Sequence, residues 1–64
     1  MDELHEIKQR LAYQVFKETG NTNAAQNWEE ATRILNHFVD RHPESPEWME
    51  QGRLLRRYRD LIYS

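Results

Sequence analysis

Cysteine is absent from this 64-residue sequence, and glycine and proline occur only twice each. Without cysteine there is no disulfide framework and no thiolate metal site. A domain of this size buries only about 60% of the surface that its unfolded chain exposes, so its stability must come from a small apolar core. The scarcity of glycine and proline, which interrupt regular structure, favours a few long elements.

Long hydrophobic runs are also missing. No apolar stretch approaches the roughly 18 residues that mark a membrane-spanning helix, so we expect no membrane contact. The chain opens with the acidic residues Asp2 and Glu3 and no apolar run follows, so we expect no signal peptide and predict a cytoplasmic location. Hydrophobic residues still make up 38% of the sequence and include two tryptophans, which is too apolar for a disordered chain.

Apolar residues recur every three or four positions in three segments, at about residues 2–19, 24–41 and 46–62. This spacing predicts amphipathic helices, and no segment shows the alternation of a strand. The connections of about four residues are short enough to join antiparallel neighbours. The sequence therefore predicts an all-α fold, a small antiparallel three-helix bundle in which residues 1–64 form a single domain.

The expected helix ends coincide with residues suited to them. Gly20 is expected to end the first helix, because glycine adopts the left-handed conformation without steric cost. Asn23 is the expected N-cap of the second helix, with Thr22 as the alternative. Ser45 and Pro46 are expected to begin the third helix, since proline fits the first helical position.

Two residues give more specific expectations about packing. Trp28 is expected to be buried against the first helix, at Leu11 or Val15, and near Leu55 or Tyr58 of the third. Gly52 falls in the interior of the third predicted helix, where glycine is unfavourable. We therefore expect Gly52 to mark a close approach between helices, with a tryptophan as the candidate neighbour.

Charge is unevenly distributed along the chain. Residues 1–50 contain five Lys or Arg and ten Asp or Glu, a net charge of −5, whereas residues 51–64 contain four arginines and one aspartate, a net charge of +3. Arg53, Arg56 and Arg57 share one side of the third predicted helix, away from its apolar side. That side is interpreted either as an ordinary solvated face or as a surface for an acidic partner.

No group of residues predicts catalysis or metal binding. The three histidines are not spaced as ligands of a common metal, and no cysteine accompanies them. The sequence has no glycine-rich phosphate loop, and its carboxylates fall on polar helix faces, where their acidity would not be tuned for proton transfer. We therefore expect no enzymatic activity, no cofactor, no metal and no small-molecule substrate.

The first half of the chain resembles the bacterial domain of unknown function 2934 family. The family pattern has an isoleucine-led helix with an Ala-Tyr pair, a glycine seven residues after the tyrosine, and a Trp-x-x-Ala helix. The match covers about residues 7–36, and the matching residues are Ile7, Arg10, Ala12, Tyr13, Gly20, Trp28, Glu29, Glu30, Ala31 and Leu35. The resemblance implies a helical hairpin. It implies no site residues, because the family has no assigned activity.

These observations favour a small cytosolic protein that acts by binding another protein or itself. Arginine and tyrosine are enriched at protein interfaces. The candidate contact residues are Tyr13, Arg53, Arg56, Arg57 and Tyr63. Two alternatives remain open, namely a nucleic-acid-binding regulator that uses the arginine-rich third helix and a structural homodimer paired through the first and third helices.

Overall fold

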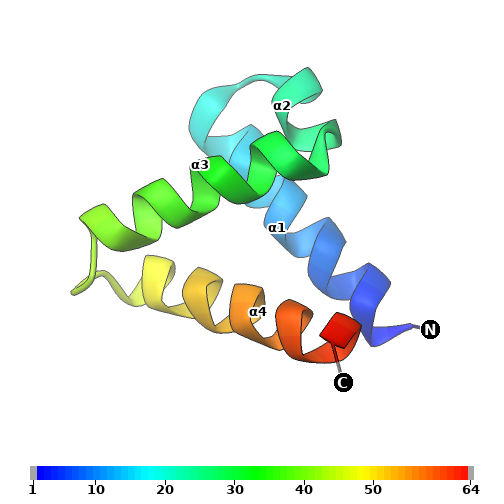
Figure 1. The fold of residues 1–64 in the computed structure, drawn as a ribbon. Helices are drawn as coiled ribbons and strands as arrows, with labels where there is room; N and C mark the ends of the chain where they lie inside the picture. The colour runs from blue at the N-terminus through cyan, green and yellow to red at the C-terminus, as the bar shows by residue number, and fades with distance from the viewer. Residues whose placement is uncertain (1, 64) are drawn as a thin grey trace.

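The computed structural model describes residues 2–63, and this part of the chain is all-α, with no strand. Four helices pack together compactly (Figure 1). They are α1 (Glu3–Thr19), α2 (Thr22–Gln26), α3 (Trp28–Arg41) and α4 (Pro46–Tyr63). The predicted all-α class is confirmed. None of the four helices, within the described range, is long and apolar enough to cross a membrane.

The first helix begins and ends where its sequence signals predict. The Asp2 carboxylate accepts a hydrogen bond of 3.2 Å from the Leu4 N–H and so satisfies one of the free donors of the first turn. Gly20 has a left-handed φ of 66°, and its N–H donates to the Phe16 carbonyl at 2.7 Å. The predicted stop at Gly20 is therefore confirmed.

The predicted continuous helix over residues 24–41 is wrong, because the chain breaks at Asn27. Asn27 has an extended backbone (φ −91°, ψ 103°), and its side chain accepts from the Glu30 N–H at 3.2 Å, which caps α3. Asn21 caps α2 in the same way, accepting from Ala24 at 3.2 Å. The predicted cap Asn23 and its alternative Thr22 both lie inside α2. Asparagine side chains compete with helical backbone hydrogen bonds, and here they divide one amphipathic segment into two helices.

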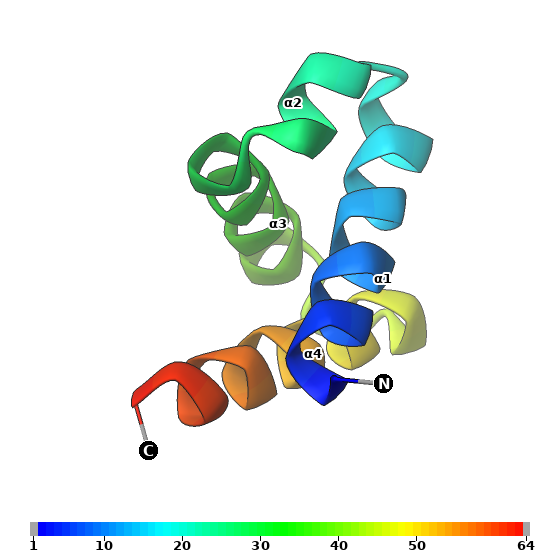
Figure 2. The same ribbon diagram turned by 90° about the vertical axis from the view of Figure 1, so that its right-hand side faces the viewer.

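The helices α3 and α4 form a hairpin and contact each other, but their axes diverge, since α3 is seen nearly end-on in Figure 2 while α4 lies across the picture. The finer prediction of an antiparallel three-helix bundle is therefore not confirmed. In two perpendicular views α1 is steeply inclined to both α3 and α4, and α2 lies beyond the upper end of α1 (Figures 1 and 2). Gln14 of α1, only 6% exposed, donates to the Glu47 carboxylate of α4 at 2.6 Å. This interhelical hydrogen bond fixes where α1 lies on α4.

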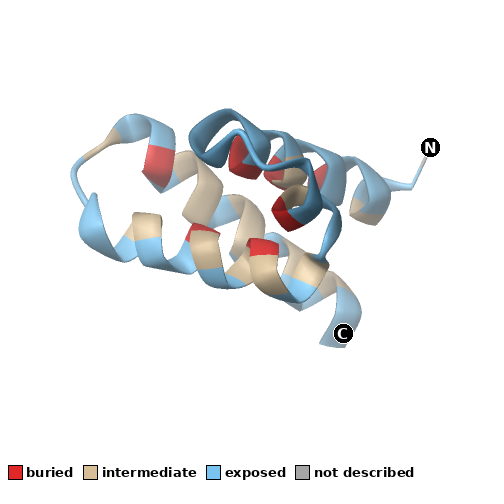
Figure 3. Ribbon diagram, turned by 90° about the horizontal axis from the view of Figure 1, so that it is seen from above, coloured by how far each residue is buried: buried red, intermediate tan, exposed pale blue. Residues whose placement is uncertain are grey.

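The apolar core is small and lies where α1 crosses the other helices (Figure 3). Leu11, Val15 and Leu35 are fully buried. The remaining core members come from all four helices and are Ile7, Ala24, Ala31 and Trp48. One row of apolar residues from α1 therefore contacts every other helix, which agrees with the helical spacing in the sequence.

Aromatic pairs join α3 to α4 near both ends of the hairpin. Trp48 stacks on Phe38 with ring centroids 5.0 Å apart, and His42 stacks on the same phenylalanine at 6.1 Å. Trp28 contacts Tyr58 with centroids 4.7 Å apart. The predicted contact of Trp28 with Tyr58 is confirmed. The predicted burial of Trp28 is met only in part, since Trp28 is half-buried and packs against the edge of the core.

Gly52 allows the hairpin helices to approach closely between these aromatic pairs. A Cβ at Gly52 would lie 3.2 Å from Val39 Cγ1, which is tighter than ordinary packing. The predicted close approach is therefore confirmed, but the neighbour is a valine rather than a tryptophan. The helix that contains Gly52 starts at Pro46, as predicted, and its first turn is closed by a 2.9 Å hydrogen bond from the Met49 N–H to the Ser45 carbonyl.

Candidate protein-binding groove

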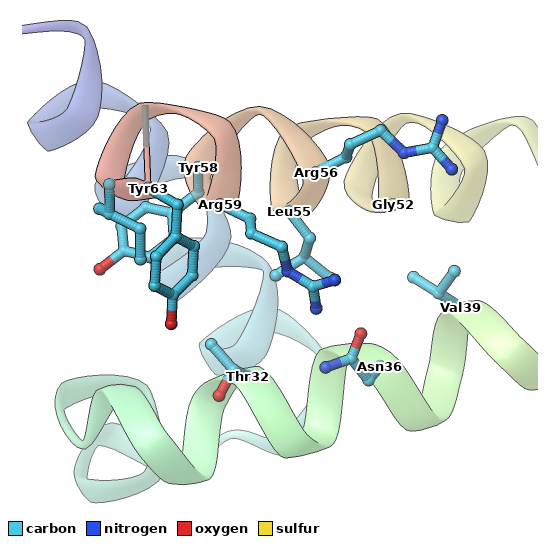
Figure 4. A pocket seen from close by; sticks show the side chains of 10 residues that line it. Thr32, Asn36, Val39, Gly52, Leu55, Arg56, Tyr58, Arg59 and Tyr63 are labelled. Carbon is cyan, nitrogen blue, oxygen red and sulfur yellow. The ribbon is translucent and has the colours of Figure 1, made fainter.

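A groove of about 380 Å³ runs between α3 and α4 on the side away from α1 (Figure 4). We call it the α3–α4 groove. Its α3 wall consists of Thr32, Asn36 and Val39. Its α4 wall consists of Gly52, Leu55, Arg56, Tyr58, Arg59, Ile62 and Tyr63. On α3 the lining residues are three, four or seven positions apart, and on α4 they recur as neighbouring pairs every three or four residues, so each set shares one helix face.

The two walls differ in character. The α3 wall is mainly polar, since Asn36 is exposed and points towards α4 (Figure 4), and the Thr32 hydroxyl donates to the Glu29 carbonyl at 2.9 Å. On α4, Leu55 is half-buried and forms an apolar floor together with Val39 of α3. The groove therefore combines an apolar floor with polar edges, which is the usual anatomy of a recognition surface.

The open end of the groove is apolar and exposed. Ile62 is 43% exposed and Tyr63 is 80% exposed, although both side chains line the groove. Figure 4 shows Tyr63 and Arg59 reaching from α4 towards α3, while Arg56 lies along α4 at the rim. Exposed apolar side chains rimmed by polar residues are a feature of sites that bind a partner.

The arginines of α4 fall into two groups with different electrostatic roles. Arg53 forms an ion pair of 2.6 Å with Glu50, one turn earlier in α4. Arg57 donates two hydrogen bonds, of 2.8 and 3.0 Å, to the carboxylate of Glu3 in α1. These hydrogen bonds lower the pKa of Glu3 and raise the pKa of Arg57. Two of the three arginines in the predicted binding stripe are therefore paired within the fold.

Arg56 and Arg59 form the second group. Neither makes an ion pair with any carboxylate in the part of the chain that the structure describes. Both line the α3–α4 groove, and no described residue of the groove lining is acidic. The groove is therefore a site of uncompensated positive charge on a protein whose net charge is −2.

The five predicted contact residues are all exposed, but they do not form one surface. Arg56 and Tyr63 line the α3–α4 groove, whereas Tyr13, Arg53 and Arg57 do not. The sequence interpretation missed the remaining polar lining, Thr32, Asn36 and Arg59. Arg59 did give a signal, because it lies within the apolar arc of its helix, where a charged residue is unusual. Whether any of these residues contacts a partner stays a prediction.

Tyr13 belongs to a separate, apolar hollow between α1 and α2. Tyr13 is 66% exposed and lies beside Phe16, which is 45% exposed. The other residues around this hollow are Gln9, Ala12, Thr22, Ala25 and Gln26. No charged side chain lines it in the described structure, so it offers apolar contact without electrostatic selectivity.

Two of the three histidines take part in aromatic packing. The rings of His37 and His42 lie 5.8 and 6.1 Å from the ring of Phe38. Over the described range, no three side chains of histidine, aspartate or glutamate come together as they would around a metal ion.

No family model matches the chain, and no curated protein or solved structure matches it significantly. The resemblance of residues 7–36 to the domain of unknown function 2934 family stays an expectation.

Proposed function

We propose that this chain is a small, non-catalytic interaction module that binds another protein in the α3–α4 groove. The observation that carries the proposal is the presence over an apolar floor at Leu55 of two arginines, Arg56 and Arg59, that make no ion pair within residues 2–63. Arginines next to apolar surface are typical of binding hot spots, because the guanidinium makes several hydrogen bonds while its stem packs on aliphatic groups.

The composition of the groove supports binding rather than proton transfer or nucleophilic attack. Its described polar groups are an amide, hydroxyls and guanidiniums. Guanidiniums remain protonated under ordinary conditions and therefore act as fixed hydrogen-bond donors rather than as acid–base groups. Asn36 and Tyr63 can each donate and accept, which suits selective recognition of a polar edge.

The experiment that tests this function compares two variants with the same change in net charge. Arg56→Gln with Arg59→Gln alters the groove, and Arg33→Gln with Arg53→Gln alters two exposed arginines outside it. Tagged proteins are used to capture partners from the native host, and the partners are identified by mass spectrometry. We expect a partner that the wild type and the control retain and that the groove variant loses. If every captured partner is retained by the groove variant, the α3–α4 groove is not the binding surface.

A nucleic-acid-binding regulator is the second candidate function, and the same two arginines of the groove favour it. Two guanidiniums that neutralise two phosphates of duplex DNA would give a log–log salt dependence of about −2. The pairing of Arg53 with Glu50 and of Arg57 with Glu3 counts against this function, because it involves two of the three arginines of the predicted stripe. Titration with DNA and RNA at several salt concentrations distinguishes the two functions.

A further inference from the structure

We infer that the occupant of the α3–α4 groove is an acidic amphipathic helix of about three turns from another protein. This inference rests on the proposed function and adds the chemistry of the partner. Three properties of the groove carry it, namely its length, the position of its apolar side chains, and the sign of its charge.

The length of the groove matches a short helix. Its lining on α4 extends from Gly52 to Tyr63, a stretch of twelve residues. At 1.5 Å per residue this wall is about 17 Å long, which equals about three turns of an α-helix. Figure 4 shows α3 and α4 close together at Gly52 and Val39 and farther apart towards Tyr63, so the groove widens towards the C-terminal end of α4. A helix that occupies the groove would contact Arg59 and Tyr63, whose side chains reach from α4 towards α3 (Figure 4).

The apolar side chains of the groove are spaced for a helix. Leu55 and Ile62 are seven residues apart on α4, and Val39 faces them from α3. An amphipathic helix that fills such a groove presents apolar residues at i, i+3 or i+4, and i+7. Its last apolar residue would cover Ile62 and Tyr63, which are the most exposed apolar side chains of the groove. Burial of this surface provides the main attraction.

The charge of the groove selects an acidic occupant. Arg56 and Arg59 are one turn apart, so carboxylates one turn apart on the occupant can each meet a guanidinium. Paired N–H groups of arginine bind a carboxylate in a bidentate manner, as Arg57 binds Glu3 within this protein. A basic helix would face two like charges and no acidic lining residue, and such repulsion opposes association.

A defined peptide library tests this inference on the full chain. The probe is a phage-displayed set of helical peptides of about 14 residues with apolar residues fixed at i, i+4 and i+7. The flanking positions vary among glutamate, glutamine and lysine. We expect selection on the wild-type protein to enrich glutamate at two flanking positions one turn apart. The best peptide should bind about tenfold more weakly to the Arg56→Gln, Arg59→Gln variant, because interface charge pairs are lost. It should bind the Arg33→Gln, Arg53→Gln control as tightly as it binds the wild type.

NMR chemical shifts of the labelled protein show where the best peptide binds. We expect changes at Asn36, Leu55 and Ile62, and none at Tyr13 or Phe16. Enrichment of lysine or glutamine, shifts centred on Tyr13 and Phe16, or absence of any binding peptide would each overturn the acidic-helix inference. None of these results would remove the proposed function if host partners still depend on Arg56 and Arg59.

Two further measurements distinguish an acidic helix from the other ligands that could occupy the groove, namely nucleic acid and a second copy of this chain. Tight, salt-sensitive binding of RNA or DNA that the groove variant loses would make nucleic acid the ligand and overturn the inference. Sedimentation that shows a concentration-dependent dimer, abolished in the same variant, would make a second copy of this chain the occupant. If no host partner and no peptide depends on the groove, the proposed function itself fails.

Discussion

Arg57 and Glu3 are joined by two hydrogen bonds across 54 residues of sequence. The pair connects the first turn of α1 to the second half of α4, and both side chains are about half exposed. Arg57 therefore belongs to the fold at least as much as to the surface. This assignment differs from the sequence interpretation, in which Arg57 is part of a binding stripe.

The first prediction concerns the titration of Glu3. Hydrogen bonds from Arg57 hold the pKa of Glu3 below its ordinary value of 4.5. A carboxylate whose pKa is lowered by folding stabilises the folded state above its unfolded pKa, and this contribution is lost as the pH falls through the folded pKa. We expect Arg57→Gln to raise the pKa of Glu3 in an NMR titration. The difference in melting temperature between variant and wild type should also shrink as the pH falls from 6 to about 3. An unchanged Glu3 titration would show that the pair does not persist in solution.

The second prediction ranks two core residues. Leu35 is fully buried, so Leu35→Ala should cost about 2–5 kcal/mol. This is comparable with the roughly 3–5 kcal/mol that a core of this size supplies. We expect Leu35→Ala to lack a cooperative thermal transition by circular dichroism. Trp28→Ala should remain folded with a lower melting temperature, because Trp28 is only half-buried. A larger loss of stability in Trp28→Ala than in Leu35→Ala would place Trp28 at the centre of the core.

The third prediction concerns the asparagine caps. Asn27→Ala removes the acceptor for the Glu30 N–H and should destabilise the protein by about 1 kcal/mol. Asn23→Ala is the matched control, because Asn23 lies exposed inside α2, where alanine is the better helix former. Urea denaturation measures both variants. Equal destabilisation by the two substitutions would mean that the Asn27 side chain does not stabilise α3 as its N-cap.

The fourth prediction concerns the contact between Gly52 and Val39. Alanine is favoured over glycine in a helix by about 1 kcal/mol, but a Cβ at position 52 meets Val39 Cγ1 at 3.2 Å. We expect Gly52→Ala to stabilise the protein more in a Val39→Ala background than in the wild type. A double-mutant cycle of unfolding free energies measures this coupling. Additive effects would show that the two helices are not in close contact at this point.

Features that depend on local chemistry could be predicted from the sequence. The stop at Gly20 and the start at Pro46 follow from conformational preferences of single residues, and the structure confirms both. Asn27 was missed because the apolar spacing continues through Trp28 into α3, so periodicity alone shows one helix. The hydrogen bond of the Asn27 side chain, rather than apolar spacing, decides the break.

Features that depend on the arrangement of helices could not be predicted. The pairing of Arg57 with Glu3 needs the steep crossing of α1, which no local pattern encodes. The α3–α4 groove needs residues from two helices, and a helical wheel of α4 alone cannot show that Asn36 faces Arg59 (Figure 4). The sequence analysis grouped Arg56 with Arg53 and Arg57 on one side of the helix, yet of these three only Arg56 lines the groove.

The helix α2, only five residues long between Asn21 and Asn27, is a region of low local stability. This five-residue helix contributes one buried residue, Ala24, to the core. Segments with few buried apolar contacts open at a lower free-energy cost than the whole domain. The amide protons of α2 will therefore exchange with solvent through local opening while α3 and α4 remain folded. The chain can open locally at α2 while the α3–α4 groove stays intact.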